Sequence, residues 1–240
     1  MPTHHTVRSF DEELKYLEAK IAEMGGHAER MIERAINAVV HDDLHLASEV
    51  IAEDVILDES EREIDEKAVT IIAKRQPMAV DLREIIGAIR ISADLERVGD
   101  MGKNIAKRAP AIAETRQPAT FYRGLEAFAS LALNQLKEVL DAYASRSVER
   151  IDAVRERDEE IDAMYTSLFR ELLTYMMEDP RNITACTHLL FCAKNIERIG
   201  DHATNIAETL HYIITGSYLA TERPRDDLTY KLGVSGLTEK

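Results

Sequence analysis

A seven-residue phrase that occurs twice constrains this chain more than any other feature. Residues 94–100 read Asp-Leu-Glu-Arg-Val-Gly-Asp, and residues 195–201 read Asn-Ile-Glu-Arg-Ile-Gly-Asp. Each copy is followed at the same spacing by Asn-Ile-Ala. A repeat at this separation in a chain of 240 residues predicts two related halves.

The apolar residues follow a helical spacing. From Phe10 to Ala38 they recur alternately four and three positions apart, which is typical of a helix in a bundle. The residue before a proline disfavours helical geometry, so Pro77, Pro110 and Pro180 mark helix ends. These patterns predict helices over residues 10–38, 44–75, 81–109, 120–144, 147–178 and 182–215.

The predicted fold is all-α, with two tandem three-helix bundles related by the internal repeat. Aromatic residues make up only 5% of the chain and Trp is absent, which suits packed helices better than a sheet. We expect an N-terminal bundle over residues 1–112, a linker closed by Pro118, a C-terminal bundle over 118–216 and a mobile tail over 217–240. Asp81 is expected to cap the third helix.

Charge and cysteine content limit the partners and the compartment. The net charge is -14, so a phosphate backbone would be repelled and nucleic-acid binding is not expected. Cys186 and Cys192 stand six apart on a predicted helix and are interpreted as buried free thiols. The N-terminus lacks the apolar segment of a signal peptide, and no uncharged run is long enough for a membrane span. We expect a cytoplasmic protein.

The repeated phrase places a Glu and an Asp four residues apart, on the same face of a helix. A search of the neighbouring helices finds the same acidic spacing, with Asp in place of Glu in one copy. The candidate metal ligands are Glu61, Asp65, Glu96, Asp100, Asp158, Asp162, Glu197 and Asp201. Each half could therefore bring two acidic faces together.

Converging carboxylates need a cation. Like charges four apart on a helix repel by about 0.2–0.5 kcal/mol even when exposed. Arg97 and Arg198 adjoin the Glu of each copy and are expected to point away from the acidic row. The row continues to Asn104 and Asn205, which are secondary candidates as neutral oxygen ligands. This pattern favours Mg, Mn or Fe over Zn, because hard cations prefer oxygen ligands.

Gly99 and Gly200 support a functional role for the acidic face. A glycine inside a helix costs about 1 kcal/mol relative to Ala, so its recurrence indicates close approach of another backbone or of a ligand. Two alternatives remain at this point. One is a metal-dependent hydrolase or oxidase, although the ferritin-like Glu-x-x-His spacing occurs only once, at Glu208 and His211. The other is a structural helical scaffold in which arginines neutralise the acids.

Several motifs resemble the PhoU family of bacterial phosphate-transport regulators. They are the duplicated Glu-Arg-Val/Ile-Gly-Asp phrase, Arg-Gln-Pro at 75–77, Asp-Leu-Arg at 81–83 and Tyr-Met-Met-Glu-Asp-Pro-Arg at 175–181. The similarity covers residues 10–216. It implies two three-helix bundles, a homodimer, and metal clusters held by paired Glu/Asp-x-x-x-Asp motifs at the eight acids given above. Asp158 is shorter than Glu, which implies a weaker or different second site.

The resemblance also implies a function. Members of this family act in the cytoplasm beside a high-affinity phosphate ABC transporter and a membrane sensor histidine kinase. They limit phosphate uptake and restrain the phosphate-starvation response when phosphate is plentiful. We therefore expect a non-enzymatic, metal-binding adaptor without a transmembrane segment, peripheral at the inner face of the membrane.

Overall fold

The computed structural model describes residues 8–114 and 119–219, and within these ranges it contains helices and no strands. The predicted end of the linker at Pro118 and most of the predicted tail lie outside the described residues. The helices are α1 (Arg8–Val40), α2 (Leu44–Arg75), α3 (Val80–Ala106), α4 (Ala109–Ala113), α5 (Thr120–Ser145), α6 (Val148–Glu156), α7 (Asp158–Glu178), the 3-10 helix η1 (Pro180–Asn182) and α8 (Ile183–Thr215). The all-α prediction is confirmed.

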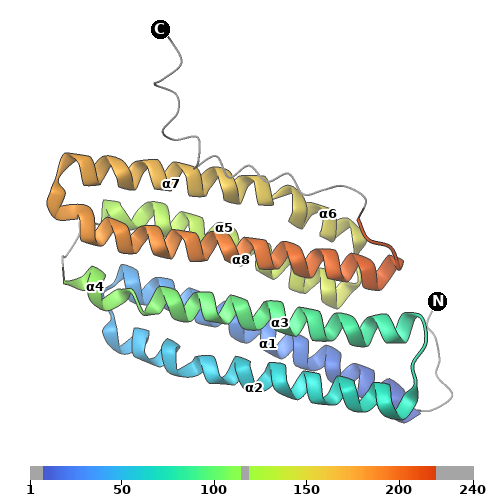
Figure 1. The fold of residues 1–240 in the computed structure, drawn as a ribbon. Coiled ribbons are helices and arrows are strands. Elements are labelled where there is room, and N and C mark those ends of the chain that lie inside the picture. The colour runs from blue at the N-terminus through green and yellow to red at the C-terminus, as the bar shows by residue number, and fades with distance from the viewer. Residues whose placement is uncertain (1–7, 115–118, 220–240) are drawn as a thin grey trace, which may run out of the picture.

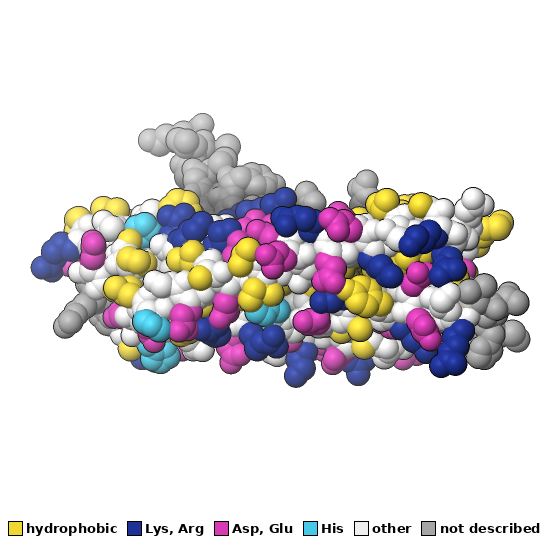
Figure 2. All heavy atoms as spheres, turned by 90° about the horizontal axis from the view of Figure 1, so that it is seen from below, with side chains coloured by type: hydrophobic (Ala, Val, Ile, Leu, Met, Phe, Trp, Pro, Cys, Tyr) yellow, Lys and Arg dark blue, Asp and Glu magenta, His cyan; other side chains and the backbone are white. Residues whose placement is uncertain are grey.

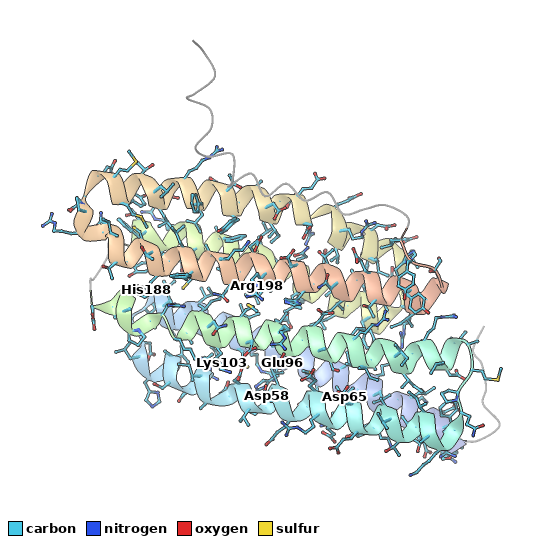
Figure 3. All side chains as sticks on the ribbon, in the orientation of Figure 1. Asp58, Asp65, Glu96, Lys103, His188 and Arg198 are labelled. Carbon is cyan, nitrogen blue, oxygen red and sulfur yellow. The ribbon has the colours of Figure 1, made fainter. Side chains whose placement is uncertain are left out.

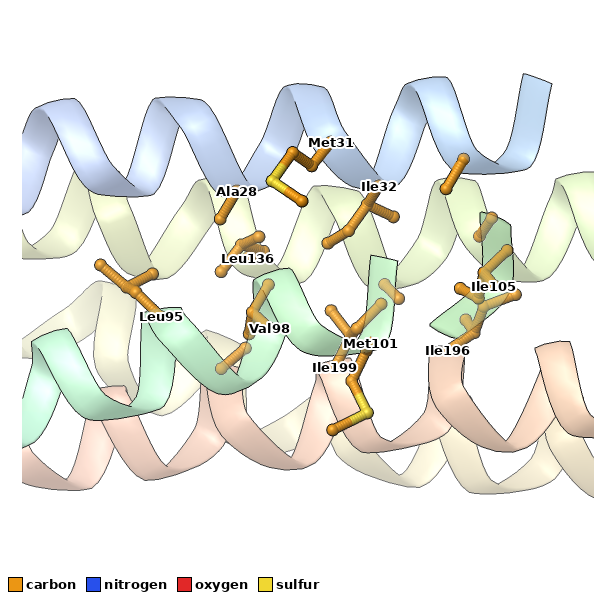
Figure 4. Close-up of a cluster of buried hydrophobic side chains, with 14 of the residues drawn as sticks. Ala28, Met31, Ile32, Leu95, Val98, Met101, Ile105, Leu136, Ile196 and Ile199 are labelled. Carbon is orange, nitrogen blue, oxygen red and sulfur yellow. The ribbon is translucent and has the colours of Figure 1, made fainter. Parts of the chain in front are cut away.

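The two halves lie side by side rather than end to end. Helices α1 to α4 form one half and α5 to α8 the other, and α3 and α8 run alongside each other where the halves meet (Figure 1). The buried apolar residues form one continuous cluster through both halves. Figure 4 shows part of it, with Met31 of α1, Val98 of α3, Leu136 of α5 and Ile199 of α8 pointing into the space between these helices.

Local sequence explains the ends of α2. The Asp43 side chain accepts a hydrogen bond from the backbone N–H of Leu46 at 2.9 Å, which satisfies one free donor of the first turn. At the other end Gln76 adopts a left-handed backbone with φ of 48° just before Pro77. The predicted bounds of this helix, 44–75, are confirmed.

Two predicted boundaries of the third helix were wrong. Asp81 does not cap α3, because the helix begins at Val80 and its cap position is Ala79. Asp81 instead lies in the first turn, where a negative charge interacts favourably with the helix dipole. The helix ends at Ala106 rather than near residue 109, and Pro110 lies in the first turn of the short α4, where its missing N–H costs nothing.

The single helix predicted over 147–178 is broken at Arg157 into α6 and α7. The cause is the buried side chain of Gln135 on α5, whose Nε2 donates to the Val154 carbonyl at 3.0 Å. In an unbroken helix that carbonyl would accept from the N–H of residue 158. A side chain inserted into the backbone ladder is a known cause of helix kinks. The break makes Asp158 the first residue of α7.

The cysteine prediction is confirmed for the folded chain. Cys186 and Cys192 are buried and unbridged, and burial raises their thiol pKa values to about 11 and about 12. Of the helices in the described residues, none has an apolar stretch long enough to cross a membrane.

Candidate functional site

The repeated glycines set the register between neighbouring helices. The Leu57 side chain of α2 lies against Gly99 of α3, so closely that a Cβ on this glycine would collide with Leu57 Cδ1. In the second half, a Cβ on Gly200 of α8 would lie 3.1 Å from Ile161 Cγ2 of α7. The predicted close approach is therefore that of a neighbouring helix, and Leu57 and Ile161 are equivalent positions.

This equivalence shows which acids of the two halves correspond. Counted from Leu57 and Ile161, the counterparts of Asp158 and Asp162 are Asp54 and Asp58. The sequence analysis took Glu61 and Asp65 as the acidic pair of this helix, seven residues further along than Asp54 and Asp58. Asp54 and Glu61 each begin an acid-x-x-apolar-Asp stretch, and only helix packing shows which of the two stretches corresponds to the second-half pair. Asp54 and Asp58 were missed for this reason.

The first-half cluster contains its own cations. Asp54 is 6% exposed and accepts a hydrogen bond from Lys103 Nζ, which also lies 3.2 Å from Asp100 Oδ1. Arg97 Nε lies 3.3 Å from Glu96 Oε2, and its Nη1 lies 3.3 Å from Asp100 Oδ2. The expectation that Arg97 points away from the row was wrong, because residues three apart on a helix are neighbours and a long guanidinium side chain reaches both acids.

The carboxylates of α2 and α3 nevertheless repel one another. Burial raises the pKa of Glu96, and the charges of Asp100, Glu61 and Asp58 raise it further. The pKa of Glu61 is raised by burial and then by Asp65. Asp58 and Asp65 of α2 lie beneath Glu96 of α3 in Figure 3. The predicted meeting of acidic faces therefore occurs between these two helices.

Asp65 lies one turn beyond Glu61 on α2. Its Oδ1 atom is buried and has no hydrogen-bond partner among the described residues. A buried acceptor without a donor is costly, and the charge of Asp65 contributes to the raised pKa of Glu61.

The second-half cluster is centred on Glu197. This side chain is 7% exposed, and its Oε1 accepts a hydrogen bond from Lys194 Nζ at 2.8 Å. Its Oε2 is buried and has no hydrogen-bond partner in the described part of the chain. Burial raises the pKa of Glu197, Lys194 opposes this shift, and the charges of Asp201 and Asp162 add to it. The structure thus brings three of the four predicted second-half acids together.

The fourth acid, Asp158, has a neutral hydrogen-bond donor among its partners. It is 7% exposed, and its Oδ1 accepts from Thr204 Oγ1 at 3.2 Å. Gln135 Nε2 in turn lies 3.3 Å from Thr204 Oγ1, so the side chain that breaks the helix also supports this contact. As the first residue of α7, Asp158 interacts favourably with the helix dipole.

The secondary candidate Asn205 belongs to a different contact. Its Nδ2 lies 3.4 Å from Asp94 Oδ1, and His202 Nδ1 lies 2.8 Å from the same oxygen. These bonds join α8 to α3 between the halves, and Asp94 and Asn205 line a cleft with Glu61 of α2. Asn104, its counterpart in the repeat, is half-buried on α3.

As the side chains stand, the described residues include no group of three or more His, Cys, Asp or Glu that could hold a metal ion. The two clusters differ in how well their side chains suit a metal ion. The second offers carboxylate oxygens and an unpartnered buried atom of Glu197, which suit a hard cation after side-chain rotation. The first does not fit, because the ammonium of Lys103 lies between Asp54 and Asp100.

Comparison with known proteins covers both halves. The family model for the PhoU domain matches residues 21–109 and 125–210. The phosphate-specific transport system accessory protein PhoU homolog of Rhizobium meliloti is 67% identical over 95% of this chain and 97% of that protein. The homolog of Caulobacter vibrioides is 51% identical over 94% of this chain and 98% of that protein.

Solved structures share the fold. The crystal structure of PhoU from Pseudomonas aeruginosa has a TM-score of 0.83 and 38% identity, and the match covers 87% of this chain and 100% of that one. The phosphate transport system regulatory protein PhoU from Streptococcus pneumoniae has a TM-score of 0.81 and 27% identity, covering 88% of this chain and 100% of that one. Since the family model matches both halves and the sequence relatives span nearly all of the chain, this protein belongs to the PhoU family, with one PhoU domain in each half.

Proposed function

We propose that this chain is a non-enzymatic accessory protein of a phosphate transporter, which limits uptake and restrains the phosphate-starvation response when phosphate is plentiful. The observation that carries the proposal is the match of both halves to the PhoU domain. A relative with 67% identity over nearly the whole chain is described as a phosphate-specific transport system accessory protein, which supports the same role.

The proposed partners are components of a phosphate ABC transporter and a sensor histidine kinase, which a homodimer of this chain would contact at the inner face of the membrane. The net charge of -14 favours basic partner surfaces. On the face shown in Figure 2, acidic and basic side chains are interspersed with apolar ones. Helix α2 exposes Leu44, Val55, Ile56 and Val69, so apolar contacts are expected to contribute to docking there.

The proposal includes a hard cation, Mg, Mn or Fe, in the second half. Asp162 of α7 and Glu197 and Asp201 of α8 would hold it, with Asp158 beside them. The ion would neutralise carboxylates that now repel one another and would link the two helices. Its role would be to fix the angle between α7 and α8 in the adaptor.

The alternatives receive different support. In the first half, Arg97 and Lys103 neutralise the acids, which favours the structural-scaffold interpretation for that cluster. A metal-dependent hydrolase would need a substrate-binding cleft that adjoins its metal ligands. The cleft of about 440 Å³ beside the first cluster includes Glu61 and Asn205 in its lining, but not Glu96 or Asp100. A ligand in this cleft would not contact Glu96 or Asp100, and this disfavours a hydrolase in which these two acids hold a catalytic metal.

The regulatory role is tested by deleting the gene for this chain and following a phosphate-starvation reporter in phosphate-rich medium. We expect the deletion to raise reporter activity at least tenfold, and the wild-type chain supplied in trans to restore repression. A deletion strain that represses the reporter normally would overturn the proposal.

Metal binding is tested by elemental analysis of protein purified without chelator. Asp201→Ala should lower the bound metal to background while the circular dichroism spectrum stays helical. Glu159→Ala, which removes an exposed acid of α7, is the matched control and should retain the wild-type content. Equal metal in the Asp201 variant and the wild type would show that Asp201 is not a ligand.

A further inference from the structure

The repeat allows the two acidic clusters to be compared position by position. Lys103 follows Asp100 by three residues, and Thr204 follows Asp201 by three. Each of them bonds the buried aspartate at the equivalent place on the neighbouring helix, Lys103 to Asp54 and Thr204 to Asp158. The two clusters therefore differ at this position by one positive charge.

The ammonium of Lys103 lies where a bridging ion would have to bind. It contacts Asp54 of α2 and Asp100 of α3, and so links the same two helices that a metal would link. Figure 3 shows Lys103 on the side of α3 that faces α2. The positively charged ammonium is therefore already bonded to a carboxylate of each helix. A divalent ion held by both carboxylates would have to displace it.

The second cluster has its lysine elsewhere. Lys194 precedes Glu197 by three residues, and its counterpart in the first half is Ala93. Its side chain is 44% exposed, whereas that of Lys103 is 26% exposed. Lys194 bonds one oxygen of Glu197, and the other oxygen, which is buried, has no hydrogen-bond partner among residues 8–114 and 119–219.

We propose that Lys103 is the resident cation of the first-half cluster and closes that cluster to metal ions. The ammonium links α2 and α3, as the proposed function has a metal ion link α7 and α8. This inference rests on the proposed function only for that comparison. Removing Lys103 opens a site for a hard divalent cation, made of Asp54, Asp58, Glu96 and Asp100.

The test compares Mn²⁺ binding by the full-length wild type and by Lys103→Thr, which copies the second-half residue. Isothermal titration should give one more bound ion per chain in the variant, with first-half affinity at least tenfold above that of the wild type. Mn²⁺ should also raise the Tm of the variant more than that of the wild type. Lys107→Thr, an exposed lysine at the end of α3, is the charge-matched control and should bind as the wild type does.

Two further variants locate the new site. Adding Asp54→Asn to Lys103→Thr should abolish the extra ion. Lys103→Gln keeps a hydrogen-bond donor for Asp54, and it replaces the Thr variant if that protein does not fold. The proposal is overturned if the folded Lys103 variant binds no more Mn²⁺ than the wild type, or if Asp54→Asn alone removes an ion from the wild type. A wild type without metal and a Lys103 variant with one ion would support this inference and refute the second-half site.

Discussion

At Gly99 and Gly200, side chains of α2 and α7 reach the backbone of α3 and α8. Neither glycine has a positive φ, so conformational freedom does not explain them. The limited space explains them, because Leu57 occupies the volume that a methyl group would need at Gly99, and Gln135 and Ile161 crowd that volume at Gly200. The recurring glycine, which in the sequence could indicate a bound ligand, is explained by helix packing. The same packing positions the neighbouring acids.

Two glycine substitutions should have opposite signs. In Gly99→Ala the new methyl would collide with Leu57 Cδ1 in a filled core, so the cost falls in the upper part of the overpacking range, about 2–3 kcal/mol, and outweighs the roughly 1 kcal/mol gained by removing a helical glycine. In Gly26→Ala the nearest atom is 3.5 Å away, so the variant should be stabilised by about 0.5–1 kcal/mol. Urea unfolding measures both, and equal effects would contradict the packing argument.

At the scale of the element, the break between α6 and α7 depends on one residue of another helix. The amide of Gln135 satisfies the Val154 carbonyl and supports Thr204, which in turn bonds Asp158. The equivalent helix of the first half, α2, runs unbroken from Leu44 to Arg75. The two halves therefore share a repeat but differ in how their acidic helices begin.

Gln135→Leu should destabilise the protein by about 1–3 kcal/mol, because it leaves the buried Val154 carbonyl without its donor. Asn134→Leu, an exposed neighbour on the same helix, is the control and should change the free energy of unfolding by less than about 0.5 kcal/mol. Urea titration followed by circular dichroism separates them. A Gln135 variant as stable as the wild type would mean that the break has another cause.

At the scale of the whole molecule, the two halves are joined by the shared apolar core and also by ion pairs. Arg146, at the end of α5, lies 2.8 Å from Glu84 of α3 and 3.6 Å from Glu18 of α1. Burial raises the pKa of Glu84 although Arg146 opposes the shift. The folded state therefore binds a proton at Glu84 more readily than the unfolded chain does.

This shift predicts a pH dependence. Because the folded-state pKa of Glu84 lies above the ordinary value of 4.5 for a glutamate, the wild type should lose stability relative to Glu84→Gln as pH rises through and above 4.5. Arg146→Met should steepen that loss, because the opposing charge is gone. Unfolding free energies between pH 4 and pH 8 test both variants, and a difference independent of pH would refute the assignment.

The sequence by itself determined the all-α fold, most of the helices, the internal repeat and the family resemblance. These features follow from local rules, because apolar spacing, prolines and helix caps involve residues that are close in sequence. The ends of α2 at Asp43 and Gln76 are an example. Glu96, Asp100, Glu197 and Asp201 could be found in the same way, because the repeat itself marks them.

Only the tertiary structure decided which acids face one another. Asp54 and Glu61 each begin an acid-x-x-apolar-Asp stretch, seven residues apart and on nearly the same face of α2. The choice between them depends on which apolar residue packs against Gly99, a contact between helices that no local pattern encodes. For the same reason the ammonium of Lys103 among the acids could not be predicted: its partner Asp54 lies on another helix, and helix packing brings the two together.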